Sequence, residues 1–154
     1  MLDLNNLGKY REGNRLEARQ ALGGLPESLW ETYSAFANAE GGVILLGVEE
    51  YKDRSLHPID LPDPMALVQE FLALLPAKAS INLLTEDSIV WLEMDGKDVV
   101  AIEIPKAQPD QQPVYIGQDP FTGTYYRRGD GDFRCSREEV RAMLDRAARF
   151  HAGA

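Results

Sequence analysis

The chain has little of what secreted, membrane-spanning or zinc-dependent proteins need. Cys135 is the only cysteine and cannot form an internal disulfide, so we expect a reducing, cytoplasmic setting. His57 and His151 are isolated from each other and from Cys135, which argues against a structural zinc site. No apolar run approaches the roughly 20 residues that cross a bilayer. The first residues do not show a basic segment followed by an apolar segment, so we expect no secretory signal. We therefore expect no membrane partner.

Basic residues are also scarce, since the 154-residue chain carries a formal net charge of −9. This balance argues against a broadly basic nucleic-acid-binding surface. The charge is uneven, however: residues 127–149 contain seven arginines and five acids. That segment is either a solvated helix face or a local binding face.

Apolar residues make up 44% of the chain and charged residues 27%, as in ordinary globular domains. The length suits one domain with a real core, so we expect residues 1–154 to form a single domain. The order of strands and helices expected along the chain predicts an α/β (α+β) architecture, a mixed sheet with helices packed on it.

Hydrophobic spacing, together with the positions of glycine and proline, indicates where the strands and helices lie. Residues 15–21 alternate weakly and predict a strand that puts Glu17 and Arg19 on one face. A helix should begin after Pro26, with a capping box of Ser28 and Glu31, and end at the paired glycines 41–42. Residues 43–46 then predict a strand buried on both faces.

The second half of the chain predicts one more long helix and several short strands. A helix is expected over residues 63–75, ended by Pro76, with Met65, Val68, Leu72 and Leu75 facing inward. Strands are expected at residues 81–84, 89–94, 99–104, 114–116 and 125–127, with a turn at residues 95–96. Ser136 and Glu139 form a second capping box that opens the last helix.

Several of these segments together resemble the Schlafen AlbA-like domain family, which is widespread in bacteria in transcriptional-regulator proteins. The resemblance covers nearly the whole chain. It is carried by residues 12–19 (Glu-x4-Glu-x-Arg), 35–42 (Ala-Phe-Ala-Asn-Ala-Glu-Gly-Gly), 44–50 (Ile-Leu-Leu-Gly-Val-Glu-Glu), 112–115, 125–129 and 136–139. It implies an AlbA-like fold and an association with DNA or RNA.

In the Schlafen branch the same resemblance implies a metal-dependent ribonuclease site. Its acids match Glu12, Glu17 and either Glu49 or Glu50 here, with Glu12, Glu17 and Glu49 as ligands of Mg²⁺ or Mn²⁺. The position of the family's catalytic lysine holds Arg19, which is not an equivalent substitute because its guanidinium is a planar fork. Exposed carboxylates paired with neighbouring arginines are the alternative reading of these acids.

A second candidate site lies near the end of the chain. Tyr126, Arg127, Arg128 and Arg134 mix aromatic faces, which stack on bases, with cations that bind phosphates. Burial of part of this set within a strand pair is the structural alternative.

Three functions follow as hypotheses. The first is a nucleic-acid-binding domain of a transcriptional-regulator type protein. The second is a metal-dependent endoribonuclease that uses Glu12, Glu17, Arg19, Glu49 and Glu50. The third is a non-enzymatic interaction domain that forms a homodimer, which suits the net negative charge.

Overall fold

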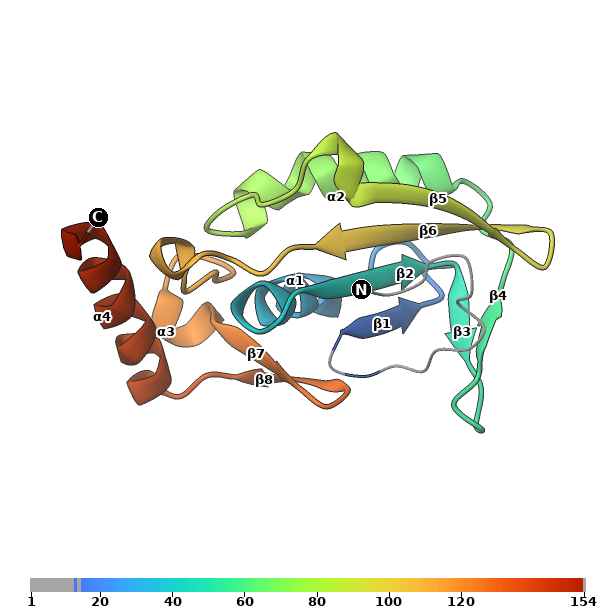
Figure 1. Cartoon of the computed structure of the whole chain (residues 1–154). Helices are drawn as coiled ribbons and strands as arrows, with labels where there is room; N and C mark the ends of the chain where they lie inside the picture. Colours follow the sequence, from blue (N-terminus) through green and yellow to red (C-terminus); the bar gives the residue numbers. More distant parts are fainter. Residues whose placement is uncertain (1–12, 14, 154) are drawn as a thin grey trace.

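The computed structural model describes residue 13 and residues 15–153 of the chain. Its core is a four-stranded sheet with the order β1-β2-β6-β5 (Figure 1). The strands are β1 (Leu16–Arg19), β2 (Gly42–Leu46), β5 (Ile89–Met94) and β6 (Lys97–Ile104). β1 pairs with β2 in parallel, and the other two pairs are antiparallel. The predicted α+β class and the predicted strands at these positions are confirmed.

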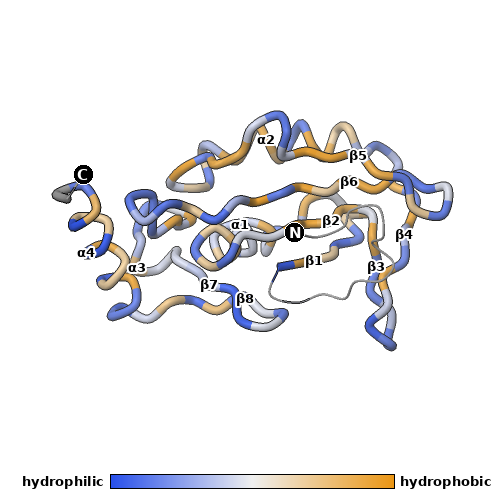
Figure 2. The backbone as a smooth tube through the Cα atoms, in the orientation of Figure 1, coloured by the Kyte–Doolittle hydropathy of each residue, from blue (hydrophilic) through white to orange (hydrophobic). Residues whose placement is uncertain are grey.

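Two helices cover one face of this sheet. α1 (Ser28–Asn38) and α2 (Pro64–Lys78) pack on it through a shared apolar cluster that includes Ile44 and Ile102. Trp30 of α1 stacks on Phe71 of α2, with ring centroids 5.0 Å apart. Figure 2 shows the hydrophobic colouring that α2 and β6 share.

The ends of the two helices differ from the prediction. α1 has Glu27 at its N-cap with no side-chain cap bond, so the expected capping box at Ser28 is wrong. α2 continues past Pro76 to Lys78. Its buried residues are Leu67, Val68, Phe71 and Leu75, while Met65 and Leu72 are exposed. Apolar residues occur on several faces of this helix, so spacing alone does not choose its inward face.

The other face of the sheet carries a second apolar cluster. Leu16, Val43 and Val99 belong to it, and so do Val48 and Leu56. The last two come from the small antiparallel pair β3 (Val48–Glu50) and β4 (Leu56–Pro58). β2 is therefore buried along its whole length, as predicted.

A strand predicted at residues 81–84 is wrong, because that segment has no strand pairing. It leads instead into the short 3₁₀ helix η2 (Glu86–Ser88), while a similar turn, η3 (Pro109–Gln111), follows β6. Tyr33 holds residues 81–84 against α1: its hydroxyl donates to the Ile81 carbonyl at 2.7 Å and accepts from the Leu83 N–H at 2.9 Å. Burial raises the pKa of Tyr33 to about 12.

The C-terminal part of the chain forms one end of the molecule (Figure 1). A single-turn helix α3 (Pro120–Gly123) precedes the hairpin of β7 (Tyr125–Arg128) and β8 (Gly131–Arg134), and α4 (Arg137–Gly153) follows. The capping box of α4 is confirmed: Glu139 accepts from the Ser136 N–H at 2.7 Å, and Ser136 accepts from the Glu139 N–H at 3.1 Å. No helix in the described part of the chain is long and apolar enough to span a membrane.

Candidate functional site

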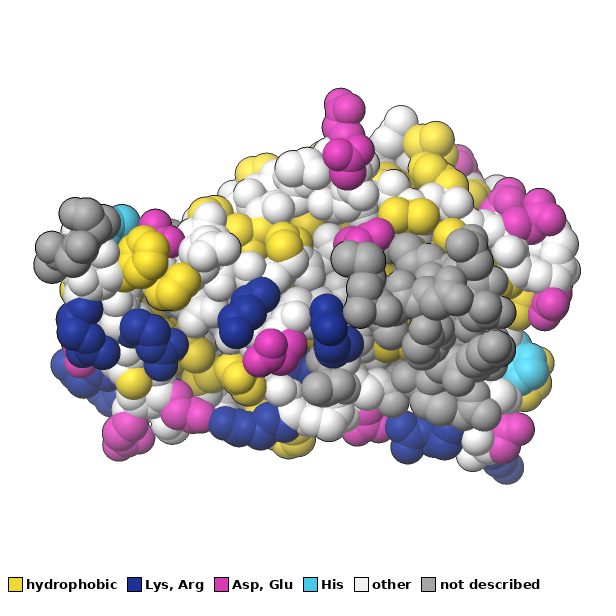
Figure 3. All heavy atoms as spheres, viewed as in Figure 1, with side chains coloured by type: hydrophobic (Ala, Val, Ile, Leu, Met, Phe, Trp, Pro, Cys, Tyr) yellow, Lys and Arg dark blue, Asp and Glu magenta, His cyan; other side chains and the backbone are white. Residues whose placement is uncertain are grey.

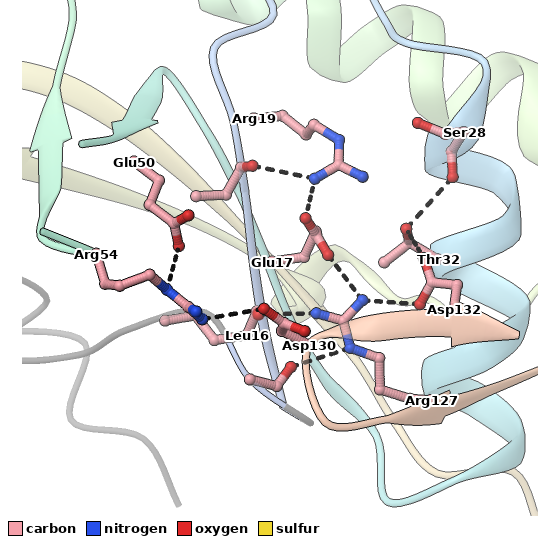
Figure 4. A network of polar contacts seen from close by, with 12 residues as sticks. Leu16, Glu17, Arg19, Ser28, Thr32, Glu50, Arg54, Arg127, Asp130 and Asp132 are labelled. Carbon is pink, nitrogen blue, oxygen red and sulfur yellow. Dashed lines mark hydrogen bonds and ion pairs between the residues drawn. The ribbon is translucent and has the colours of Figure 1, made fainter. Parts of the chain in front are cut away.

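Glu17 of β1 and Arg127 of β7 form a buried ion pair on the α1 side of the sheet (Figure 4). A guanidinium nitrogen of Arg127 lies 2.7 Å from Oε1 of Glu17. The side chain of Arg127 is 0% exposed and that of Glu17 is 6% exposed. A charge at this depth requires partners for most of its donors, because water cannot reach them.

Arg127 uses its remaining donors on two other segments. Its Nε donates to the Gly13 carbonyl at 2.9 Å, and a terminal nitrogen donates to the Leu16 carbonyl at 3.2 Å. It also pairs with Asp132 of β8 at 2.7 Å, and its guanidinium lies over the ring of Phe36, 4.9 Å from the centroid. Arg127 thereby connects the β7–β8 hairpin to β1 and α1.

The partners of Arg127 are themselves bonded. Thr32 of α1 donates to Asp132 at 2.6 Å, and Glu17 accepts from Arg19 through its second carboxylate oxygen. Arg19 also donates to the Ala18 carbonyl at 3.1 Å. The prediction that Glu17 and Arg19 share a face of β1 is confirmed. Both oxygens of Glu17 are therefore occupied by guanidinium groups.

The acids that follow Gly47 and Val48 lie beside the end of β1, since β3 contacts β1. Glu49 accepts a hydrogen bond from Gln20 at 2.9 Å. Glu50 pairs with Arg54 at 3.5 Å, and Arg54 reaches Asp130, on the β7–β8 turn, at 3.0 Å (Figure 4). The hairpin thus takes part in the ion pairs of both predicted acid segments.

The described residues do not by themselves test the predicted cation site, because Glu12 lies outside them. No group of three or more acids, histidines or cysteines there is placed to hold a metal ion. Hard cations such as Mg²⁺ need several carboxylate or carbonyl oxygens directed at one point. The oxygens of Glu17 and Glu50 are directed at arginines instead. Glu12, the remaining predicted ligand, lies outside the described residues, so the ribonuclease hypothesis stays a prediction.

Asn38, in the family-like segment 35–42, has a role that sequence reasoning missed. Its amide accepts from the Val114 N–H at 2.8 Å and donates to the carbonyls of Val114 and Tyr125, each at 2.9 Å. Ser34 adds a bond to the Val114 carbonyl at 2.7 Å and accepts from the Tyr125 N–H at 3.0 Å. Two polar residues one turn apart on a helix with many apolar residues, which bond each other at 3.3 Å, are the signal that could have found this cross-link. It fixes the start of β7 against α1.

A second set of side chains, here named the arginine–aromatic surface, gathers around the β7–β8 hairpin and the start of α4. In each contact a guanidinium carbon lies 4.4–5.9 Å from a ring centroid. Such contacts are within the usual range for cation–π attraction. The members are Phe121, Tyr125, Tyr126, Arg128, Arg134, Arg137 and Arg141. Figure 3 shows further cations over α4, at the same end of the molecule.

The predicted nucleic-acid contacts divide between this surface and the interior. Arg128 is 55% exposed and pairs with Glu139 at 2.7 Å. The Ser136 backbone and Arg128 lower the pKa of Glu139. Arg134 is exposed, and a hydrogen bond to the Tyr125 hydroxyl raises its pKa further. Arg127, in contrast, is buried between the hairpin and α1, so it is a structural residue that no ligand at the surface can touch in this structure.

Comparison with known proteins identifies relatives of this fold. A family model described as Schlafen, AlbA_2 matches residues 12–136. The chain is similar to the solved N-terminal domain of a RecG-related protein from Nitrosomonas europaea, whose name refers to ATP-dependent DNA helicases. The identity is 27% and the TM-score 0.65, over 88% of this chain and 94% of that one.

A second solved structure, the DIP2311 protein from Corynebacterium diphtheriae, shares the fold with a TM-score of 0.55 and 18% identity. The match covers 85% of this chain and 24% of that longer chain. No curated protein matches the chain.

Proposed function

This chain belongs to the Schlafen AlbA_2 family, and we propose that it binds nucleic acid through the arginine–aromatic surface. The observation that carries the proposal is the pairing of exposed arginines with aromatic rings at one end of the molecule. Guanidinium groups bind phosphate oxygens in a bidentate manner, and aromatic rings accept stacked bases. The name of the RecG-related neighbour adds support from a DNA-associated protein.

The charge of this surface is favourable although the whole chain is acidic. Arg134, Arg137 and Arg141 form no ion pair with any carboxylate among the described residues, so their charges are available to a ligand. The buried Arg127 pair and the Asn38 bonds hold the hairpin in place from below. A polyanion would therefore meet a hairpin whose backbone is held in place, with Arg134 on its second strand and Arg137 and Arg141 on the helix that follows.

The test compares two variants with equal changes in charge. One carries Arg134→Gln, Arg137→Gln and Arg141→Gln, and the control carries Lys52→Gln, Lys78→Gln and Lys97→Gln. Fluorescence anisotropy with labelled DNA and RNA oligonucleotides at 50 mM salt should show binding by the wild type and by the control. The arginine variant should lose affinity, and its slope of log K against log salt should fall by about 0.7–0.9 for each lost phosphate contact.

Two results would contradict the proposal. One is a wild-type protein that binds no oligonucleotide at low salt, and the other is an arginine variant that binds as well as the wild type. A role in transcription would further require a sequence preference, which competition among oligonucleotides of different sequence measures. Dimer formation stays a prediction, and sedimentation velocity tests it.

A further inference from the structure

Phe133 lies on the outer face of the β7–β8 hairpin, and 51% of the residue is exposed. It follows Asp132, whose carboxylate points inward to Arg127 and Thr32. Because side chains alternate along a strand, Phe133 points the other way. Its cross-strand partner is Tyr126, so two aromatic rings occupy neighbouring positions on this outer face.

The folding of the hairpin does not explain this exposed phenylalanine. The three buried apolar clusters of the described chain contain Tyr126 at the margin of one of them, and Phe133 belongs to none. The hairpin is held through its inner face by Arg127 and through the Asn38 bond to Tyr125. Its place beside Tyr126 and opposite the Arg128 strand, rather than its exposure alone, suggests a binding role.

The neighbours of Phe133 are suited to a charged ligand with flat apolar parts. Arg128 lies over the Tyr126 ring at 5.4 Å and faces Gly131 across the hairpin. A Cβ at Gly131 would stand 3.0 Å from the Phe133 ring, so the ring occupies space that only glycine leaves open at this position. The outer face therefore presents an aromatic ring with Arg128 on the opposite strand, which also pairs with Glu139, while alternation directs Arg134 to the inner side.

We infer that Phe133 is a stacking residue and that the nucleic acid bound by this surface is single-stranded. The inference rests on the proposed function and names its ligand class. An unpaired base has a free face that an exposed ring can cover, and every base has such a face. In a duplex the base faces are already covered by their neighbours, and only groove edges and phosphates are offered. The rings and arginines of this hairpin match the first pattern.

Duplex binding is the competing outcome, because a two-stranded ribbon also fits the major groove. The two modes differ in what the central side chain does. A side chain that recognises base edges in the major groove needs hydrogen-bonding groups, whereas Phe133 has only an apolar ring. We therefore expect stronger binding to a single strand than to a duplex of the same sequence.

The experiment measures the affinity of the wild type and three variants for a labelled 12-nucleotide strand. The strand is used as DNA, as RNA, and annealed to its complement. Phe133→Leu keeps an apolar side chain without the ring, Phe133→Tyr keeps the ring, and Trp91→Leu removes a ring of similar exposure from β5. Loss of stacking should weaken single-strand binding by Phe133→Leu roughly 5- to 150-fold. Phe133→Tyr and Trp91→Leu should bind as the wild type does.

The salt dependence separates stacking from charge. Phe133→Leu should keep the wild-type slope of log K against log salt, because it removes no phosphate contact. Comparison of the affinities for the DNA and RNA strands shows which type of nucleic acid the protein prefers. The inference is overturned if Phe133→Leu binds the single strands with wild-type affinity, or if the duplex binds at least as tightly. Failure of the wild type to bind any strand would instead remove the proposed function itself.

Discussion

Arg127 and Glu17 form the ion pair that connects the β7–β8 hairpin to the central sheet, with 2.7 Å between their charged groups. Glu17 comes from the acid pattern that resembles a catalytic motif, and Arg127 from the segment that resembles a nucleic-acid contact. Their pairing shows that the two segments meet in space. Each residue satisfies the charge of the other, which a buried pair requires.

Removal of Arg127 should destabilise the fold strongly. Arg127→Met leaves the buried Glu17 and the partly buried Asp132 without this cation and also frees the Gly13 and Leu16 carbonyls. Breaking a buried pair from one side costs about 3–5 kcal/mol of unfolding free energy. Urea denaturation measures it.

A double-mutant cycle with Glu17→Gln is the control for that result. The double variant should lose less stability than the sum of the two single variants, since each single change already removes the pair. Arg127→Lys, which keeps the charge but not the fork, should lie between wild type and Arg127→Met. A loss below about 1 kcal/mol in Arg127→Met would contradict the account of a structural arginine.

Gly41 should tolerate substitution less well than Gly96, although both have positive φ, at +75° and +77°. A Cβ at Gly41 would stand 2.8 Å from the Ile104 carbonyl oxygen, whereas nothing lies within 4 Å at Gly96. Gly96→Ala should therefore cost about 1–2 kcal/mol for its conformation alone. Gly41→Ala should cost more, and equal denaturation midpoints for the two variants would contradict the packing argument.

The capping box of α4 should be measurable by one substitution. Ser136→Ala removes the acceptor for the Glu139 N–H and should reduce stability by about 1 kcal/mol. Ser136→Asp is the matched control, because aspartate is an equally good cap. Thermal unfolding followed by circular dichroism gives both values, and a Ser136→Asp variant as unstable as Ser136→Ala would argue against capping.

Cys135 should react slowly with thiol reagents while the protein is folded. Burial, with a smaller contribution from Glu139, raises its pKa from 9.0 to about 11. Below pH 9 the native thiolate fraction should then be roughly 100-fold lower than in the unfolded chain, since each pKa unit is tenfold. The raised pKa also stabilises the fold below pH 9, and this contribution disappears as the pH rises through 11.

Reaction with a chromogenic disulfide at pH 8, with and without denaturant, measures this difference. Denaturant should accelerate the reaction by two orders of magnitude or more, because unfolding also exposes the sulfur. Equal rates in the two conditions would show that the thiol is not protected. Cys135→Ala supplies the blank for both.

Much of the fold could be predicted because local signals agreed with tertiary structure. The turn at residues 95–96 separates β5 from β6 as expected, and β2 is buried on both faces. The predictions failed where a local pattern had several solutions. Ser28 and Glu31 have capping-box spacing, but helix α1 begins with Glu27 as its N-cap. Strand β8 was not expected, because Gly131 and Asp132 are poor strand formers. These residues form a strand here through their pairing with β7.

The candidate site was predicted less completely, for reasons of distance along the chain. The shared face of Glu17 and Arg19 follows from strand alternation and is confirmed. The burial of Arg127 does not follow from its neighbours, because its partners Glu17 and Gly13 lie at the other end of the sequence. Alternation does separate Arg127 from Arg128, but it does not say which of the two is inside.

The salt dependence of oligonucleotide binding is the sharpest test of a nucleic-acid interface formed by the β7–β8 hairpin and the start of α4. The wild type should bind at 50 mM salt and lose affinity steeply by 200 mM, and Arg134→Gln with Arg137→Gln and Arg141→Gln should flatten this dependence. Binding that is unaffected by both salt and these substitutions would contradict an interface at this end of the molecule.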